Sequence, residues 1–263
     1  MVFTKSSLIV PITCVLAALL FWFRPGGITG PRVEPIPMDG KAFDHSLLTE
    51  VYRQVVDDKG TVDYAALKNK PDTLNRYLGH IAAVSPKNAP HRFRRMDDRL
   101  AYYLNAYNAF VLASVRDQCP IENVDEEYIG GGFFWRISFL MGGQPITLTG
   151  LQSERIRPVM QRNPSVHFAL VGGAKGHAGL PKQAYQGARL KEQLAALEKR
   201  IVANPRFVEK RDRVLILSQI FQWYRSDFVD PKQWVGRLLP DTIEGVDLVS
   251  YSPFDWSLNG RCP

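Results

Sequence analysis

The sequence predicts an α+β domain in which helices pack around a small, mainly antiparallel sheet, preceded by an N-terminal membrane helix. Three observations support this expectation. Stretches with helical spacing of apolar residues recur from residue 44 onward, short apolar runs bounded by glycines lie between them, and an uncharged apolar run stands near the N-terminus. The length of 263 residues suffices for one large core.

The N-terminal run from Leu8 to Phe23 has no charged residue and is flanked by Lys5 and Arg24. It lies near the lower limit of the ~17–25 residues that a spanning helix needs. A cleaved signal peptide is the alternative, but the run ends in three aromatic residues instead of a small-residue cleavage pattern, and aromatic residues beside an arginine suit a membrane interface. We therefore expect a single-pass anchor or uncleaved signal over residues 1–24.

The rest of the chain divides into a linker and one domain. Residues 25–42 are rich in proline and glycine, which predicts a linker, and residues 43–263 are expected to form a single globular domain. With the anchor in place, we expect localisation at the membrane, with the domain on the extracytoplasmic side.

Three helical regions are expected in the first half of the domain. Apolar spacing predicts a helix over residues 44–56 and a second helical region over residues 67–81, broken at Pro71. The strongest signal, over residues 97–116, has apolar side chains on nearly every face. Because such a helix is surrounded by protein, Asn105 and Asn108 need buried partners; they either tie neighbouring loops to the helix or line a site.

A hairpin and a further helix are expected next. Apolar segments on either side of Gly142-Gly143 have the pattern of a β-hairpin that ends near Leu148. Thr149 is expected to cap a helix that extends to about Met160.

The stretch from Ser165 to Leu180 organises the middle of the chain. Residues 166–171 are predicted to form a buried strand that contains His167. A glycine-rich loop with Gly172, Gly173 and His177 follows, and such loops expose backbone amides and reactive side chains. We expect a binding or catalytic site there.

The last third of the domain is expected to alternate short elements. A helix is predicted over residues 190–202, and short strands at residues 207–208 and 214–217. Ser218 is expected to cap a helix that ends near Asp227, and a last helical stretch over residues 234–243 precedes an extended tail.

Charge and motif content limit the partners. The formal net charge is +7, but the basic residues are scattered and no basic run is interleaved with aromatic residues as in chains that follow a nucleic-acid backbone. We expect no nucleic-acid partner and no cofactor.

The three cysteines, Cys14, Cys119 and Cys262, are far apart and show no CxxC spacing. A Cys119–Cys262 disulfide would require an oxidising compartment. Because the sequence gives no distance between them, we expect these two thiols to be unpaired.

Motifs between residues 44 and 259 resemble those of the domain-of-unknown-function family 547, and their fixed order makes the resemblance specific. It implies that family's fold for nearly the whole domain, and no settled activity. The matching motifs are Gly60-x-Val62-Asp63-Tyr64, Leu104-Asn105-Ala106-Tyr107-Asn108-Ala109, Thr147-Leu148 with Ile156-Arg157, Val166-His167-Phe168-Ala169-Leu170, Gly173-Ala174, Ala184-Tyr185, Ser218-x-Ile220-Phe221-x-Trp223-Tyr224-x-x-Asp227-Phe228 and Asp255-Trp256-Ser257-Leu258-Asn259.

Departures from the family pattern bear on chemistry. Where the family typically has Cys-Gly-Ala-x-Ser-Cys-Pro, this chain has Gly172 and His177 in place of the two cysteines, and Gln152 stands at a usual glutamate. If the family pattern is a thiol-based hydrolytic or transfer site, this chain lacks the nucleophile and one carboxylate, since glycine cannot replace a thiolate.

Two functions follow from these departures. The favoured one is a membrane-anchored, non-catalytic domain that binds or scaffolds an unidentified protein or small molecule. The alternative is a hydrolase or transferase of envelope material, with His167 as general base. Asn105 and Asn108 would then orient His167 or stabilise an oxyanion. The candidate ligand-binding residues are Gln152, Arg157, Gly172, Gly173, His177 and Tyr185.

A third hypothesis makes His167 and His177 metal ligands together with Asp227 or Glu154. Two histidines and a carboxylate would suffice for zinc, but their spacing matches no standard motif. We therefore expect no metal site.

Overall fold

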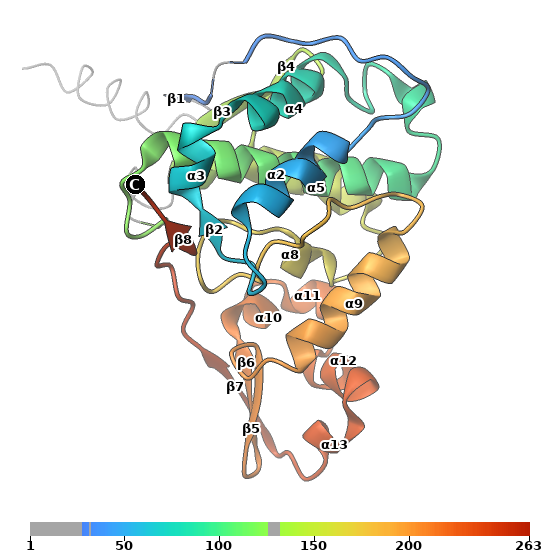
Figure 1. Cartoon of the computed structure of the whole chain (residues 1–263). Coiled ribbons are helices and arrows are strands. Elements are labelled where there is room, and N and C mark those ends of the chain that lie inside the picture. The colour runs from blue at the N-terminus through green and yellow to red at the C-terminus, as the bar shows by residue number, and fades with distance from the viewer. Residues whose placement is uncertain (1–27, 32, 126–131) are drawn as a thin grey trace, which may run out of the picture.

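The computed structural model describes residues 28–31, 33–125 and 132–263. Helices and small sheets are mixed, which agrees with the predicted α+β class. Figure 1 shows α5 (Met96–Gln118) running across the upper half of the molecule, with the β3–β4 hairpin above it and the β5–β6–β7 sheet at the opposite end.

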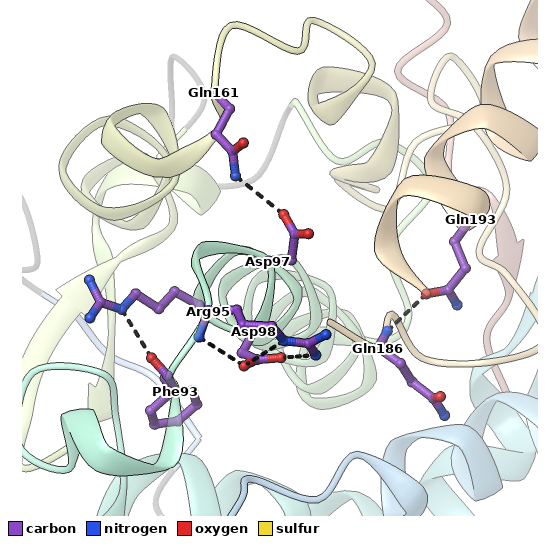
Figure 2. Close-up of polar contacts among 8 residues, drawn as sticks. Phe93, Arg95, Asp97, Asp98, Gln161, Gln186 and Gln193 are labelled. Carbon is purple, nitrogen blue, oxygen red and sulfur yellow. Dashed lines mark hydrogen bonds and ion pairs between the residues drawn. The ribbon is translucent and has the colours of Figure 1, made fainter. Parts of the chain in front are cut away.

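Helix α5 is the centre of the core. Every residue from Leu100 to Arg116 is buried, so the predicted all-round burial of this helix is confirmed. At its start the Asp98 carboxylate accepts from the Arg95 backbone N–H at 3.0 Å and forms an ion pair with the Arg95 guanidinium. Figure 2 shows this end of α5, where Asp97 also accepts a hydrogen bond from Gln161.

Helices α2 (Ser46–Val55), α3 (Tyr64–Asn69) and α4 (Asp72–Ala83) form a layer on α5. The predicted first helix is confirmed, and so is the break at Pro71, which stands between α3 and α4. Proline lacks the N–H that would continue α3, but it is tolerated at the start of α4.

The remaining helical segments are short, except for α9, whose predicted bounds are confirmed. Thr147 caps the helix after the hairpin through the Gly150 N–H, so the prediction of Thr149 as the cap was wrong. The segments are η1 (Pro90–Arg92), α6 (Gly132–Trp135), α7 (Leu148–Gly150), the π-helical η2 (Leu151–Ile156), η3 (Arg157–Val159), α8 (Val166–Ala169), α9 (Leu190–Val202), α10 (Gln219–Trp223), α11 (Arg225–Phe228), α12 (Pro231–Leu238) and α13 (Pro240–Ile243).

The strands form three small sheets within the described residues, which corrects the expectation of one mainly antiparallel sheet. The pairs β3–β4 and β5–β6 are antiparallel hairpins; the first was predicted as a hairpin and the second as two short strands. The pairs β1–β3, β2–β8 and β6–β7 are parallel and join segments distant in sequence. The strands are β1 (Ile28–Thr29), β2 (Val62–Asp63), β3 (Ile137–Met141), β4 (Gln144–Thr147), β5 (Val208–Arg211), β6 (Val214–Ser218), β7 (Leu248–Ser252) and β8 (Gly260–Arg261).

The segment predicted as the central strand is a helical turn, so that prediction was wrong. The backbone N–H groups of Val166, His167 and Phe168 each donate to the carbonyl three residues earlier, beginning with Asn163. An uninterrupted apolar run marks burial and does not distinguish a strand from a buried helical turn. The chain becomes extended only at Leu170.

The predicted anchor, residues 1–24, lies outside the described residues. In the part that the structure describes, no helix combines the length and apolar character needed to cross a membrane. Of the predicted linker, Ile28–Thr29 pairs with β3, and the Ile36 N–H donates to the Gly79 carbonyl at 3.0 Å. This segment therefore lies along the domain surface.

Cys119 and Cys262 form a disulfide with their Cα atoms 5.5 Å apart, which corrects the expectation of unpaired thiols. The pair is separated by 143 residues, so no local pattern predicts it. The β2–β8 pairing brings the C-terminal segment beside α3, and Lys68 of α3 donates to the Cys119 carbonyl at 3.5 Å. The sheet thus places Cys262 at the end of α5.

Removing this disulfide should lower the free energy of unfolding. The chain-entropy model for a closed loop of this size gives on the order of 4–5 kcal/mol. We expect a Cys262→Ser, Cys119→Ser variant to unfold at lower denaturant concentration than wild type, and reductant to lower the wild-type midpoint in the same way. A Cys14→Ser variant is the matched control. Equal midpoints in the presence and absence of reductant would contradict the assignment.

Candidate functional site

The imidazole of His167 is held from two sides by the C-terminal part of the chain. Its Nε2 lies 2.8 Å from Asp227 Oδ2, and its ring stacks on Tyr224 with centroids 3.7 Å apart and an interplanar angle of 5°. Only 3% of His167 is exposed. These contacts orient the ring and fix its hydrogen-bonding direction.

The same two partners hold two predicted ligand-binding residues. Arg157 donates to Asp227 Oδ1 at 2.7 Å, and Gln152 Nε2 donates to the Tyr224 hydroxyl at 2.8 Å. Segments η2 and η3 therefore bring their polar side chains against α10 and α11. We call Gln152, Arg157, His167, Tyr224 and Asp227 the polar cluster.

Burial lowers the pKa of His167 to about 4, although hydrogen bonding to Asp227 acts in the opposite direction. The imidazole is therefore neutral at pH 7. Because the Asp227 carboxylate can only accept a hydrogen bond, Nε2 carries the imidazole proton and Nδ1 is the bare acceptor. Nδ1 is buried and has no hydrogen-bond partner among the described residues. The cluster thus contains an oriented base whose lone pair is sealed from solvent.

Asn105 and Asn108 form hydrogen bonds to the backbone of neighbouring loops. The side-chain amide of Asn105 donates to the Tyr185 carbonyl at 2.8 Å and accepts from the Tyr185 N–H at 2.9 Å. Asn108 pairs in the same way with the Ala169 carbonyl and the Val171 N–H. Of the two roles considered for them, the hydrogen bonds support loop attachment, and neither amide is bonded to His167.

Gly172 and His177 face each other. A Cβ built on Gly172 would lie 2.6 Å from His177 Cε1 and 3.0 Å from a Phe134 ring atom. The His177 imidazole thus occupies the volume that a larger residue at position 172 would need. The ring also makes a T-shaped contact with Phe254, 4.8 Å between centroids.

The two other predicted ligand-binding residues lie apart from the polar cluster. Gly173 has φ +83°, a left-handed conformation that glycine adopts without strain, and its carbonyl accepts from the Asn259 N–H at 2.7 Å. Tyr185 lines a hollow of about 260 Å³ together with Lys182, Gln193 and Arg200.

The described residues contain neither a nucleophile bonded to His167 nor a metal cluster. No Cys, Ser or Thr side chain hydrogen-bonds to the imidazole over residues 28–31, 33–125 and 132–263. Over the same ranges, no group of three or more His, Cys, Asp or Glu residues could hold a metal ion. The metal hypothesis for His167 and His177 therefore gains no support from the geometry.

The roles of Asp227 and Tyr224 were not predicted. Asp227 entered the sequence analysis only as an alternative metal ligand, because 60 residues separate it from His167. A signal was nevertheless present, since both residues stand in the motif that follows Ser218. That motif could have suggested a second polar group near His167.

The comparisons with known proteins support the family resemblance. The family model described as "Protein of unknown function, DUF547" matches residues 92–201. The matched segment contains every candidate catalytic and ligand-binding residue of the sequence analysis, and it ends before Tyr224 and Asp227. No curated protein and no solved structure matches the chain.

Acid should destabilise the fold through three histidines. Burial lowers the pKa of His45, His167 and His177 to about 4. The unfolded chain therefore binds protons between about pH 6.5 and 4 that the folded chain does not. The free energy of unfolding should be highest above pH 6.5 and should fall toward pH 4 by up to about 1.4 kcal/mol per pH unit for each histidine.

Urea unfolding at pH 7, 6 and 5 checks this dependence. In a His177→Gln variant the free energy of unfolding should depend less steeply on pH than in wild type, because unfolding then takes up about one proton fewer. This holds whatever the variant's stability at pH 7. A free energy of unfolding that does not change between pH 7 and 5 would contradict the burial of neutral imidazoles.

The contact between positions 172 and 177 predicts that two cysteines there would pair. We expect the Gly172→Cys, His177→Cys variant to form a disulfide, detectable by thiol titration and by peptide mapping without reductant. The single Gly172→Cys variant should lose about 1–3 kcal/mol of stability, because its side chain collides with the imidazole. Two free, reactive thiols in the double variant would instead favour an inherited thiol site.

Proposed function

We propose that this chain is a non-catalytic binding domain, and that its polar cluster binds a polar, anionic small molecule or protein group. In this proposal an N-terminal membrane segment tethers the domain in an oxidising, extracytoplasmic compartment. The observation that carries the proposal is the filled volume beside Gly172. The His177 ring lies where a nucleophilic side chain at position 172 would stand. The geometry therefore favours recognition over covalent catalysis.

The polar cluster has the means to bind an anion. The side chain of Arg157 is 43% exposed, and its hydrogen bond to Asp227 uses one of its five N–H groups. A guanidinium fixed by a carboxylate on one side can donate to a carboxylate or phosphate on the other. Asp227 holds both Arg157 and His167, and thereby sets their relative positions.

The Cys119–Cys262 disulfide supports the proposed location in an oxidising compartment. Disulfides persist in the periplasm and in secreted proteins and are rare in the cytosol, where thiols are kept reduced. The apolar run from Leu8 to Phe23 supplies the tether in this proposal.

One observation favours the alternative, a hydrolase or transferase of envelope material. The His167–Asp227 pair, at 2.8 Å, has the arrangement of a general base with its orienting carboxylate. Such an enzyme would have to activate a substrate hydroxyl or water at His167 Nδ1, which is buried. Asn105 and Asn108 would contribute only through the loops that they hold.

Ligand screening with matched variants tests the proposal. Purified full-length protein would be tested against a panel of carboxylates and phosphates by thermal shift and calorimetry. We expect at least one ligand to bind, and Arg157→Gln to weaken its binding at least tenfold, because a charge-assisted hydrogen bond contributes about 1.5–3 kcal/mol. Arg155→Gln, on the adjoining η2 segment, is the control and should leave affinity unchanged.

A parallel assay with chromogenic ester, amide and glycoside substrates distinguishes the alternative. Turnover by wild type that His167→Ala abolishes, with folding intact by circular dichroism, would overturn the non-catalytic proposal. Binding that survives Arg157→Gln would show that the anion site lies elsewhere.

A further inference from the structure

Four aromatic side chains outside the polar cluster pack against one another, and Trp223 is the most exposed of them. Trp256 lies 4.5 Å from Phe254, 5.7 Å from Trp223 and 6.2 Å from Phe134, measured between ring centroids. Trp223 is 43% exposed, which is unusual for so large an apolar side chain. We call Phe134, Trp223, Phe254 and Trp256 the aromatic cluster. Phe254 is buried and Phe134 and Trp256 are half-buried, so Trp223 stands exposed on a packed aromatic base; an exposed apolar patch marks a contact surface.

The cluster is assembled from three parts of the chain. Phe134 belongs to α6, Trp223 ends α10, and Phe254 and Trp256 follow β7. The tail is fixed to the glycine-rich loop, because the Lys175 N–H donates to the Ser257 carbonyl and the Gly176 N–H to the Asp255 carbonyl, both at 2.8 Å. The aromatic cluster is therefore a built surface held by backbone hydrogen bonds.

Two exposed cationic residues border the aromatic cluster. Lys175 precedes His177 in the glycine-rich loop, and Arg206 donates to the His177 carbonyl at 3.4 Å. His177 in turn contacts Phe254. Exposed tryptophan beside lysine and arginine is the combination found at membrane–water interfaces with anionic lipid.

The point where the N-terminal segment joins the domain lies next to this surface. Strand β1 runs parallel to β3, with Ile28 opposite Ile137, and Figure 1 shows the two strands side by side. Ile137 follows α6 (Gly132–Trp135) by two residues. Whatever precedes Ile28 therefore joins the domain beside the helix that contributes Phe134.

The length of that segment limits how far the domain can lie from a bilayer. Four residues lie between Phe23, the last residue of the apolar run, and Ile28, so that five Cα–Cα steps join the two. Fully extended, they span at most about 17 Å. A tether this short holds the α6 side of the domain close to the lipid headgroups.

We infer that the aromatic cluster, bordered by Lys175 and Arg206, rests on the surface of an anionic membrane. The inference rests on the tether of the proposed function. It adds an orientation: the domain lies with its aromatic face against the headgroups, and its tryptophans insert at the interface. A site presented in this way faces ligands at or near the membrane.

Tryptophan quenching by lipid tests the orientation. The full chain with Trp22→Phe, which removes the tether's own tryptophan, would be reconstituted in vesicles of mixed zwitterionic and anionic lipid carrying a quencher near the headgroup. We expect lipid-dependent quenching, and we expect Trp223→Phe with Trp256→Phe to remove more than half of it. Trp234→Phe is the matched control, because Trp234 lies buried in α12 and should contribute none.

The outcomes distinguish a failure of this inference from a failure of the proposed membrane tether. Extraction of the chain from vesicles by alkaline carbonate would show that the tether of the proposed function fails. A chain that resists extraction, with quenching that Trp223→Phe and Trp256→Phe leave unchanged, would overturn the inference alone and point to a protein partner for the aromatic cluster. Lys175→Gln with Arg206→Gln should reduce quenching in anionic vesicles only, and equal reduction in zwitterionic vesicles would contradict the role of charge.

Discussion

The whole fold depends on keeping helix α5 out of water. Seventeen consecutive residues, Leu100 to Arg116, are buried. A helix that is apolar on every face has no stable position at a surface, so other elements must cover all its sides. Helices α2 to α4 cover one part, the β3–β4 hairpin packs Phe139 on Phe110 at 4.3 Å, and the segments around α8 and Tyr185 complete the cover.

Two amides allow irregular chain to serve as part of that cover. A loop against an apolar helix leaves backbone groups that water cannot reach, and each unpaired group costs about 1–3 kcal/mol. Asn105 and Asn108 each offer one donor and one acceptor to such groups, at Tyr185 and at Ala169–Val171. Their side-chain amides satisfy the backbone hydrogen-bonding groups of these loops, as the backbone of a neighbouring strand does in a sheet. The motif that contains them is therefore explained by architecture.

This arrangement explains which parts of the fold the sequence could predict. Helices α2, α5 and α9, the β3–β4 hairpin and the short strands β5 and β6 depend on patterns within one segment, and the structure confirms them. Parallel pairs such as β2–β8, and the disulfide beside it, join segments far apart, and no periodicity encodes them. Residues 166–169 were predicted as a strand because a helical turn buried against α5 and a strand buried within a sheet both require an apolar run.

For the candidate site too, the sequence predicted the residues that have local signals and not the contacts that depend on tertiary packing. His167, Arg157 and Gln152 could be selected from the sequence, because a histidine in an apolar run and an arginine in a shared motif are local signals. The motif after Ser218 contains their common partners, Tyr224 and Asp227, but it does not show which residues they bond to, because tertiary packing alone brings α10 and α11 to them. The prediction therefore identified half of a hydrogen-bonded cluster and supplied the wrong partners, the asparagines of α5.

The side chain at position 152 determines what the polar cluster can offer a ligand. Gln152 donates to the Tyr224 hydroxyl, so that oxygen is already an acceptor and its own proton is free to be donated. A glutamate at the same place would accept that proton and leave none for a ligand. Glutamine at this position therefore leaves the Tyr224 O–H available as a donor toward an external acceptor. Together with the exposed guanidinium of Arg157, it gives the cluster two donors and no carboxylate at position 152, which supports the proposed recognition of an anion.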